Sequence, residues 1–404
     1  MDIESNMLTY LSTHFLRVHV TDRLDIQGYD LEIAMKYLLY SLNMVALWAC
    51  QATSPETQES ETNDSAIEDS NTQEEDTGIG DTTVPNDGDV SIPLFIVAGQ
   101  SNAEGNVRLT GLTALQEALP SHNDPLSTTE RNALREAYRI GIGDWCNPDE
   151  DYSDEMADAA IDSFRDLSLD ISAVSASYTI DGGQMIAHRW FHQDASESLG
   201  EPYENPDPNA HLAHLNQLAP MSVGFGLWDS EETEVLFYGP ELGFALRMHQ
   251  NEALTNFYMM KVAMGGSSLI EHWAPEGPMR QKLYEKTDAF LAENDAYVAG
   301  FIWFQGYNDQ FEESHRIAYK DNLSQLVSDF RATYGLHLPV VVIQARKVHD
   351  LTIIADAQAT FVAETENTVL VESDGITNCF HYDSVSQLVI GDRTANAILP
   401  LLSE

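Results

Sequence analysis

The sequence predicts an α/β protein with three layers, in which a mainly parallel sheet of about five strands lies between two layers of helices. The first observation is that apolar runs of strand length alternate with longer helical segments from residue 91 onward. The second is that these runs are apolar at nearly every position, which is typical of strands covered on both faces. The expected strands are residues 92–98, 257–264, 298–304, 338–344 and 367–372.

The segments between the expected strands carry apolar residues at helical spacing. The clearest covers residues 314–334, where four apolar side chains mark one face and Gly335 ends the helix. These four are Leu323, Leu326, Val327 and Phe330. Three further segments show a similar pattern and are expected to be helices: residues 240–253, 278–293 and 384–402.

Length and charge limit the classes of function. A chain of 404 residues is long enough to bury a full core as one large domain or two ordinary ones. It has 65 acidic side chains against 20 Lys and Arg, which gives a formal net charge of -45. Such a chain is repelled by nucleic acid and by anionic membrane surfaces, so no nucleic-acid partner is expected.

The first 90 residues differ in composition from the rest. Residues 51–90 contain no Lys, Arg or aromatic residue, and we expect an acidic disordered linker there. Residues 35–50 have the layout of a bacterial export signal, and their end resembles a lipoprotein cleavage box with Cys50 as the lipidated residue. Translation would then start at Met35, with residues 1–34 as a non-native or disordered extension. The alternative is an N-terminal amphipathic helix packed on the domain.

The export reading predicts a bacterial protein anchored by lipid in the periplasm or at the cell surface. Two further cysteines, Cys146 and Cys379, then form a disulfide or remain as two buried thiols. No spacing of Cys and His suggests zinc, and we expect no metal.

The sequence Gly99-Gln100-Ser101-Asn102 follows the first expected strand without a spacer. Ligands bind at the carboxyl edge of an open α/β sheet, and a tight turn there can hold a serine hydroxyl clear of the backbone. Ser101 is therefore the candidate nucleophile. On turn chemistry alone, the same four residues also fit an ordinary β-turn.

Polar residues follow the other expected strands and converge on the same edge. Acyl transfer needs a hydroxyl nucleophile, a base with a pKa near neutral, and donors directed at the developing oxyanion. Ser101 and His381 supply the first two, while the amides of Ser101 and Gly266 and the side chain of Asn308 supply the donors. Each residue alone also fits a structural role, as a turn, a helix cap or a surface histidine.

This set of motifs resembles the SGNH hydrolases, and within them the sialate O-acetylesterase-like branch grouped with carbohydrate esterase family six. The resemblance covers residues 91–404 and implies a flavodoxin-like SGNH fold, no cofactor, and hydrolysis of acetyl esters on sugars such as acetylxylan or sialate. The matching motifs are Gly-Gln-Ser-Asn at 99–102, Gly-Pro-Glu-Leu at 239–242, Lys-x-x-x-Gly-Gly-x-Ser-Leu at 261–269 and the Trp-x-Gln-Gly block at 303–309. We expect substrate contacts from residues in these motifs: Gln100, Asn102, Gln305 and Glu241.

The chain departs from the family pattern at two positions. Tyr307 stands where many members carry Glu, although the block Gly-Tyr-Asn-Asp agrees with the wider superfamily and supports Asn308 as an oxyanion donor. The family's catalytic acid lies three residues before the histidine, and here that position is Asn378. An amide cannot stabilise the imidazolium by charge. Asp374 is the expected replacement, with Glu372 as the second possibility.

Residues 106–236 interrupt the alternation of strands and helices, and we expect a large insertion that forms a cap or one wall of the substrate cleft. The favoured activity is a serine esterase that removes acetyl groups from acetylated oligo- or polysaccharides. The alternatives are a lipase-like or thioesterase-like acyl hydrolase, and a catalytically weakened protein that binds carbohydrate.

Overall fold

The computed structural model describes residues 91–403 apart from several gaps. Residues 1–90, which include the predicted extension, signal segment and linker with Cys50, lie outside the described residues, as do Cys146 and Cys379. Among the described helices, none is both long and apolar enough to cross a lipid bilayer. The gaps are residues 122–123, 142–151, 168, 170, 173, 191–215, 227–235, 252–253, 255, 347–351, 374–375 and 377–380.

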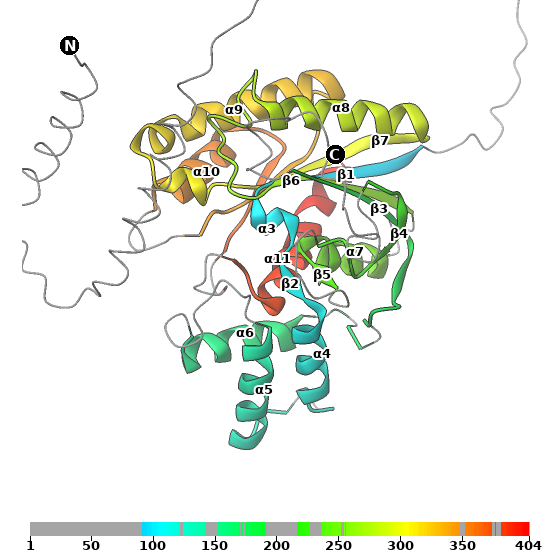
Figure 1. Cartoon of the computed structure of the whole chain (residues 1–404), viewed down its shortest axis with the longest axis vertical. Coiled ribbons are helices and arrows are strands. Elements are labelled where there is room, and N and C mark those ends of the chain that lie inside the picture. The colour runs from blue at the N-terminus through cyan, green and yellow to red at the C-terminus, as the bar shows by residue number, and fades with distance from the viewer. Residues whose placement is uncertain are drawn as a thin grey trace, which may run out of the picture. The chain divides into compact units, whose positions relative to one another are not determined.

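A seven-stranded sheet forms the centre of the described region, with the strand order β4-β3-β6-β1-β7-β8-β9 (Figure 1). Every neighbouring pair is parallel except β3 with β4, which is antiparallel. The strands are β1 (Ile92–Gly99), β3 (Thr179–Trp190), β4 (Ala219–Ser222), β6 (Phe257–Met264), β7 (Ala296–Phe304), β8 (Val340–Ile343) and β9 (Thr368–Val371).

The predicted fold class is confirmed, and the five predicted strands correspond to β1, β6, β7, β8 and β9. The sheet has seven strands rather than about five, because the segment predicted as a cap or cleft wall supplies β3 and β4. Along β3, buried residues alternate with exposed or half-buried ones from Gly183 to Ala187, and the sequence Asp-Gly-Gly lies near the start of the strand. It therefore lacks the continuous apolar run by which the central strands are recognised.

Helices cover both faces of the sheet, with α8, α9 and α10 on one side and α7 and α11 on the other (Figure 1). Alternate side chains of β1 enter the two cores, since Phe95 belongs to one and Leu94 and Ile96 to the other. These helices are α7 (Pro240–Gln250), α8 (Pro278–Glu293), α9 (Glu313–Tyr334), α10 (Ile353–Glu364) and α11 (Ser384–Ile398).

Helices α7 and α11 approach each other closely because each presents a glycine at the contact. A Cβ atom on Gly243 would lie 2.2 Å from the Leu388 carbonyl oxygen, and one on Gly391 would lie 2.1 Å from the Pro240 carbonyl oxygen. Any side chain at either position would force the helices apart. The start of α11, which follows His381, is therefore held tightly against the domain.

Three helices of the predicted insertion pack beside the start of α11. They are α4 (Leu109–Ala118), α5 (Thr128–Ile140) and α6 (Asp154–Asp166). A capping box of Ser127 and Glu130 begins α5. The guanidinium of Arg135 binds Asp154 and Asp158 at 2.8 and 2.6 Å and so joins α5 to α6. Two short strands, β2 (Val107–Arg108) and β5 (Phe237–Tyr238), form a separate antiparallel pair.

Candidate active site

The turn after β1 is built around Gly99, whose φ of 156° lies in the region that favours glycine. A Cβ atom there would lie 2.1 Å from the Phe304 carbonyl oxygen, so only glycine lets β1 turn this close to β7. The Gln100 amide donates to that same oxygen at 3.2 Å. Ser101 then begins the short helix α3 (Ser101–Glu104) with 7% of its surface exposed.

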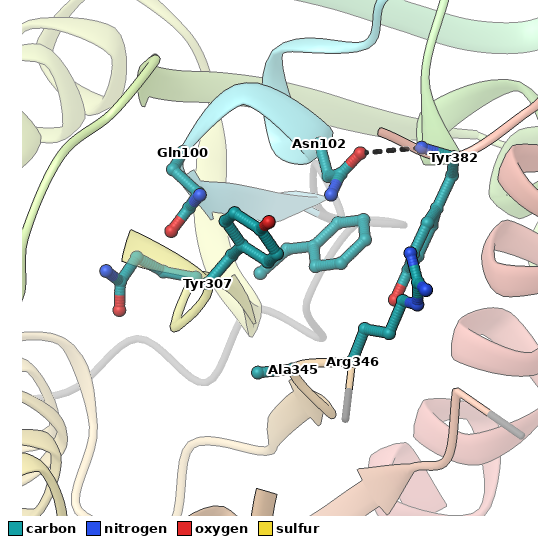
Figure 2. A pocket seen from close by; sticks show the side chains of 8 residues that line it. Gln100, Asn102, Tyr307, Ala345, Arg346 and Tyr382 are labelled. Atoms are coloured by element: carbon teal, nitrogen blue, oxygen red, sulfur yellow. Dashed lines mark hydrogen bonds between the residues drawn. The ribbon is translucent and has the colours of Figure 1, made fainter. Parts of the chain in front are cut away.

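The two residues that flank Ser101 connect it to the loops of the other candidate residues (Figure 2). The Gln100 Oε1 atom accepts hydrogen bonds from the amides of Gly306 and Asn308 at 3.2 and 3.3 Å. The Asn102 Oδ1 atom accepts one from the amide of Tyr382 at 3.0 Å. Since Tyr382 follows His381 directly, the predicted nucleophile, one predicted oxyanion loop and the predicted base lie on segments that are joined by hydrogen bonds.

A small pocket lies beside these connections, at the carboxyl ends of β1, β7 and β8. Three of the four residues predicted to contact substrate, Gln100, Asn102 and Gln305, are in its wall. The pocket is lined by Gln100, Asn102, Phe304, Gln305, Tyr307, Ala345, Arg346 and Tyr382.

Glu241, the fourth predicted substrate contact, is fully buried and its carboxylate is used inside the protein. The Lys261 ammonium donates to Glu241 Oε2 at 2.8 Å, and the Gly239 amide donates to Oε1 at 2.8 Å. Lys261 also donates to the carbonyl oxygens of Glu104 and Phe225 at 2.8 and 2.9 Å. The predicted substrate contact of Glu241 is therefore wrong, because both of its oxygens are engaged in the interior.

The buried ion pair of Lys261 and Glu241 instead supports the end of α3. Burial lowers the pKa of Lys261, and the neighbouring Glu241 carboxylate opposes this shift. The side chain of Glu104, the last residue of α3, accepts a hydrogen bond from the Gly265 amide at 2.8 Å. This contact ties α3 to the loop that carries Gly266, the predicted oxyanion amide. A lysine inside the apolar run of β6 is the sequence signal for the pair.

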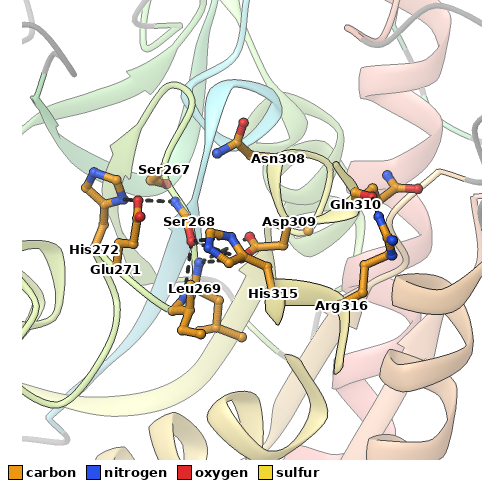
Figure 3. A network of polar contacts seen from close by, with 12 residues as sticks. Ser267, Ser268, Leu269, Glu271, His272, Asn308, Asp309, Gln310, His315 and Arg316 are labelled. Atoms are coloured by element: carbon orange, nitrogen blue, oxygen red, sulfur yellow. Dashed lines mark hydrogen bonds and ion pairs between the residues drawn. The ribbon is translucent and has the colours of Figure 1, made fainter. Parts of the chain in front are cut away.

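Gly266 and Asn308 both lie just beyond strands that neighbour β1. Gly266 has a φ of 70° and forms the turn after β6, where its position is half-buried. Asn308 begins the short helix η2 (Asn308–Gln310) after β7 and is also half-buried. Figure 3 shows that the Asn308 side chain extends away from the cluster of polar contacts around Asp309. Both predicted donors thus lie at the edge of the sheet that carries Ser101.

Asp309 links the two loops that carry these donors (Figure 3). From the Gly266 loop, Ser268 Oγ donates to Asp309 Oδ1 at 2.9 Å, and the Leu269 amide donates to the two carboxylate oxygens at 3.2 and 3.1 Å. From the β7 side, Gln305 Nε2 donates to Asp309 Oδ2. The Nδ1 atom of His315 lies 3.4 Å from Oδ1. We call these five residues the Asp309 network.

Asp309 has no exposed surface, and burial raises the pKa of its carboxyl group. The sequence identifies Asp309 only as the last residue of a motif. Its partners in the Gly266 loop are about forty residues away in the chain, and no local pattern in the sequence indicates such contacts.

The predicted base, His381, is buried with 6% of its surface exposed, and burial lowers the pKa of its imidazole to about 4. The ring is therefore neutral near pH 7, the form that a general base needs. Asn378, which stands at the family's acid position, and Asp374, its expected replacement, both lie outside the described residues. Glu372 is exposed.

Among the carboxylates that the structure describes, Asp383 is the first one after His381 in the chain. It caps the start of α11. Its Oδ1 atom accepts from the amides of Val385 and Ser386 at 2.8 and 2.9 Å. Its Oδ2 atom accepts from the hydroxyls of Tyr138 and Ser386, both at 2.8 Å. Tyr138 belongs to α5, so the inserted helices help to fix the start of α11.

In the part of the chain that the structure describes, no three His, Cys, Asp or Glu side chains form a metal-binding group.

Comparison with known proteins gives a family match over part of the chain. The model of the family described as carbohydrate esterase, sialic acid-specific acetylesterase, matches residues 209–400. This range includes Gly266, Asn308 and His381, whereas β1 and Ser101 lie before it. No curated protein sequence matches the chain significantly.

Two solved structures are similar to the chain at low identity. A protein from Arabidopsis thaliana is 15% identical, with 77% of this chain and 99% of that one covered and a TM-score of 0.44. A carbohydrate acetylesterase from Xanthomonas citri is 13% identical, with 75% of this chain and 54% of that one covered and a TM-score of 0.38. The chain thus spans about half the length of the second protein. The family match over residues 209–400 confirms the resemblance to sialate O-acetylesterases that the motifs predict.

Proposed function

We propose that the protein is a serine esterase that removes acetyl groups from O-acetylated carbohydrates. The family match supports an esterase that acts on acetylated carbohydrates. The observation that carries the proposed site is the pair of connections made by Gln100 and Asn102 on either side of Ser101. They join the serine turn to the Asn308 loop and to the residue after His381, which supports a site that brings together the nucleophile, base and oxyanion donors of acyl transfer.

In the proposed mechanism, neutral His381 takes the proton from the Ser101 hydroxyl as its oxygen attacks the acetyl carbonyl carbon. The amides of Ser101 and Gly266 and the side chain of Asn308 donate to the oxyanion that forms. His381 then gives its proton to the departing sugar oxygen, which leaves an acetyl-serine. Water adds to this ester by the same steps and releases acetate, which restores Ser101. Asp374 is the proposed carboxylate partner of His381, in place of Asn378.

The variant Ser101→Ala tests the assignment of the nucleophile. We expect it to lose acetate release from acetylated xylan and from O-acetylated sialic acid. The exposed residue Ser328 on α9 provides a matched control, because Ser328→Ala makes the same chemical change far from the site. Full activity of Ser101→Ala would contradict the assignment.

Substrate comparison separates the proposed activity from its alternatives. Rapid acetate release from acetylated sugars, with slow release of long acyl chains, is the expected result. Preference for long-chain esters would indicate a lipase-like or thioesterase-like enzyme. Binding of sugar without release of any acyl group would indicate a protein whose catalysis has been lost.

The N-terminal region carries a separate proposal, that the chain is exported and anchored through a lipid on Cys50. It rests on the charge and apolar pattern of residues 35–50. Mass spectrometry of the mature protein from a bacterial membrane fraction should find an N-terminal lipidated Cys50. An intact N-terminus at Met1 would contradict it.

A further inference from the structure

Two aromatic side chains that contact each other follow β7 in the chain. Tyr307 is in the wall of the pocket, and Figure 2 shows its ring beside Gln100. Phe311 lies just beyond η2, and 54% of its surface is exposed. The two ring centres are 5.3 Å apart and the ring planes meet at 72°, which is an edge-to-face contact. The two rings therefore form a corner, in which the plane of one ring stands steeply to the plane of the other.

The exposure of Phe311 is unusual for its chemistry. Tyrosine and tryptophan can leave a polar atom in water, whereas phenylalanine has none, and leaving it exposed forfeits the gain from burial. A single exposed apolar side chain needs no explanation. Phe311, however, is paired with a second ring, and that ring borders the candidate active site.

The corner is held at a fixed position relative to Ser101. Gln100 Oε1 accepts from the amides of Gly306 and Asn308, which are the residues on either side of Tyr307. Gly306 has a φ of 137°, and a Cβ atom there would lie 2.8 Å from Ile354 and 2.9 Å from Ala345, so the turn is tightly packed. Because Gln100 precedes Ser101 directly, its side chain links the turn of the nucleophile to the turn of the aromatic pair.

The chemistry that such a corner recognises is the face of a sugar ring. One face of a pyranose carries several C–H groups that point the same way, and these pack on the electron-rich face of an aromatic ring. A neutral apolar surface gives such a ring a place to pack without competing with its hydroxyl groups for hydrogen bonds.

We propose that Tyr307 and Phe311 form a sugar-binding platform that holds the pyranose ring of the acetylated substrate beside Ser101. This inference rests on the proposed function and deepens it by naming the contact with the sugar. The acetyl carbon is then presented to Ser101 while the sugar ring packs against Phe311 with Tyr307 at its side.

Binding is measured first, so that the platform is tested separately from catalysis. The Ser101→Ala protein is titrated by calorimetry with an acetylated xylo-oligosaccharide and with O-acetylated sialic acid. Adding Phe311→Ala should weaken the binding of at least one of these sugars about tenfold, as expected for partial loss of an aromatic contact. Adding Phe311→Tyr should retain the affinity, because it keeps the ring.

The matched control is Ile317→Ala on α9, which removes an apolar side chain that is 75% exposed and should leave binding unchanged. The thermal midpoints of the Phe311 and Ile317 variants should equal that of the parent, since neither side chain is in the core. In the background with Ser101 intact, Phe311→Ala should raise the KM for the sugar substrate. It should change kcat/KM much less for ethyl acetate, which has no ring to stack, than for the sugar substrate.

Each outcome bears on one of the two proposals. Affinity that is independent of Phe311 for both sugars overturns the platform, as does an equal loss with Ile317→Ala or an equal change for ethyl acetate. Binding that depends on Phe311, in a protein that releases no acetate, supports the platform and contradicts the proposed esterase.

Discussion

Removing the carboxylate of Asp309 should loosen the two loops that carry the proposed oxyanion donors. Its two oxygens accept hydrogen bonds from Ser268, Leu269 and Gln305, and its side chain has no exposed surface. In Asp309→Asn one oxygen remains, but an amide NH₂ replaces the other and faces groups that are themselves donors. Hydrogen bonds to a charged group contribute about 1.5–3 kcal/mol each, so losing one or two should cost about 2–4 kcal/mol of stability.

The effect on catalysis follows from the positions of Gly266 and Asn308. Their loops are joined through Asp309, so a shift between them misaligns the donors for the oxyanion. Loss of one such donor lowers kcat about 10²- to 10³-fold. We therefore expect kcat to fall about 10²-fold in Asp309→Asn. KM for the sugar should rise by a smaller factor, because Tyr307 and Phe311 lie on the Asn308 loop.

The assay combines urea denaturation with the kinetics of acetate release. Asp321→Asn, at an exposed position on α9, is the matched control and should change neither quantity. Ser268→Ala removes the contacts of Ser268 Oγ with Asp309, His315 and the Ile270 amide but keeps the bonds from Leu269 and Gln305 to the carboxylate, so it provides a milder variant if Asp309→Asn does not fold. A folded Asp309→Asn protein with the parental kcat would refute the reasoning, as would a fall in kcat/KM that comes entirely from KM.

Three further predictions concern the base and the buried ion pair. Burial lowers the pKa of His381 to about 4, and a paired Asp374 carboxylate would raise it. With Asp374 as the partner, kcat/KM should decline with falling pH well above pH 4, and Asp374→Asn should move that decline toward pH 4. A parental decline centred near pH 4 would contradict the pairing. Lys261→Met leaves the buried Glu241 carboxylate without its cation and should lower the free energy of unfolding by about 3–5 kcal/mol in urea titrations; a loss below about 1 kcal/mol would contradict this. If Asp374 is the partner of His381, Asp374→Asn should lower kcat about 10⁴-fold, by analogy with a studied serine-protease triad, and undiminished kcat would exclude that role.

The central strands were predictable from the sequence because parallel strands covered on both faces are apolar at almost every position. The run from Phe257 to Met264 forms β6 even though it contains Lys261, since the charge is balanced within the core. Strand β3 was not predictable in this way. Its buried and exposed residues alternate, and its glycines resemble those of a turn, so tertiary pairing with β6 determines its structure.

The location of the candidate site was predictable because the carboxyl ends of parallel strands meet at one edge of the sheet. Ser101, Gly266 and Asn308 each follow one of three adjacent parallel strands, and this adjacency follows from the fold class. The residues that hold the site together were not predictable, since they pair over long distances in the chain. The error at Glu241 has the same origin, because a motif indicates that a carboxylate is needed but not whether it faces substrate or the core.

The burial of His381 determines where the proposed reaction needs most stabilisation. An imidazole with a pKa near 4 is neutral and ready to accept a proton, but burial makes the imidazolium that it becomes costly. The tetrahedral intermediate therefore contains two charges, one disfavoured by burial and one held by the oxyanion donors. A base with a low pKa is a weak base and does less to lower the barrier. More of the stabilisation of the transition state must then come from the oxyanion donors. The Asp309 network, which fixes the loops of Gly266 and Asn308, thus acts where the demand on the site is greatest.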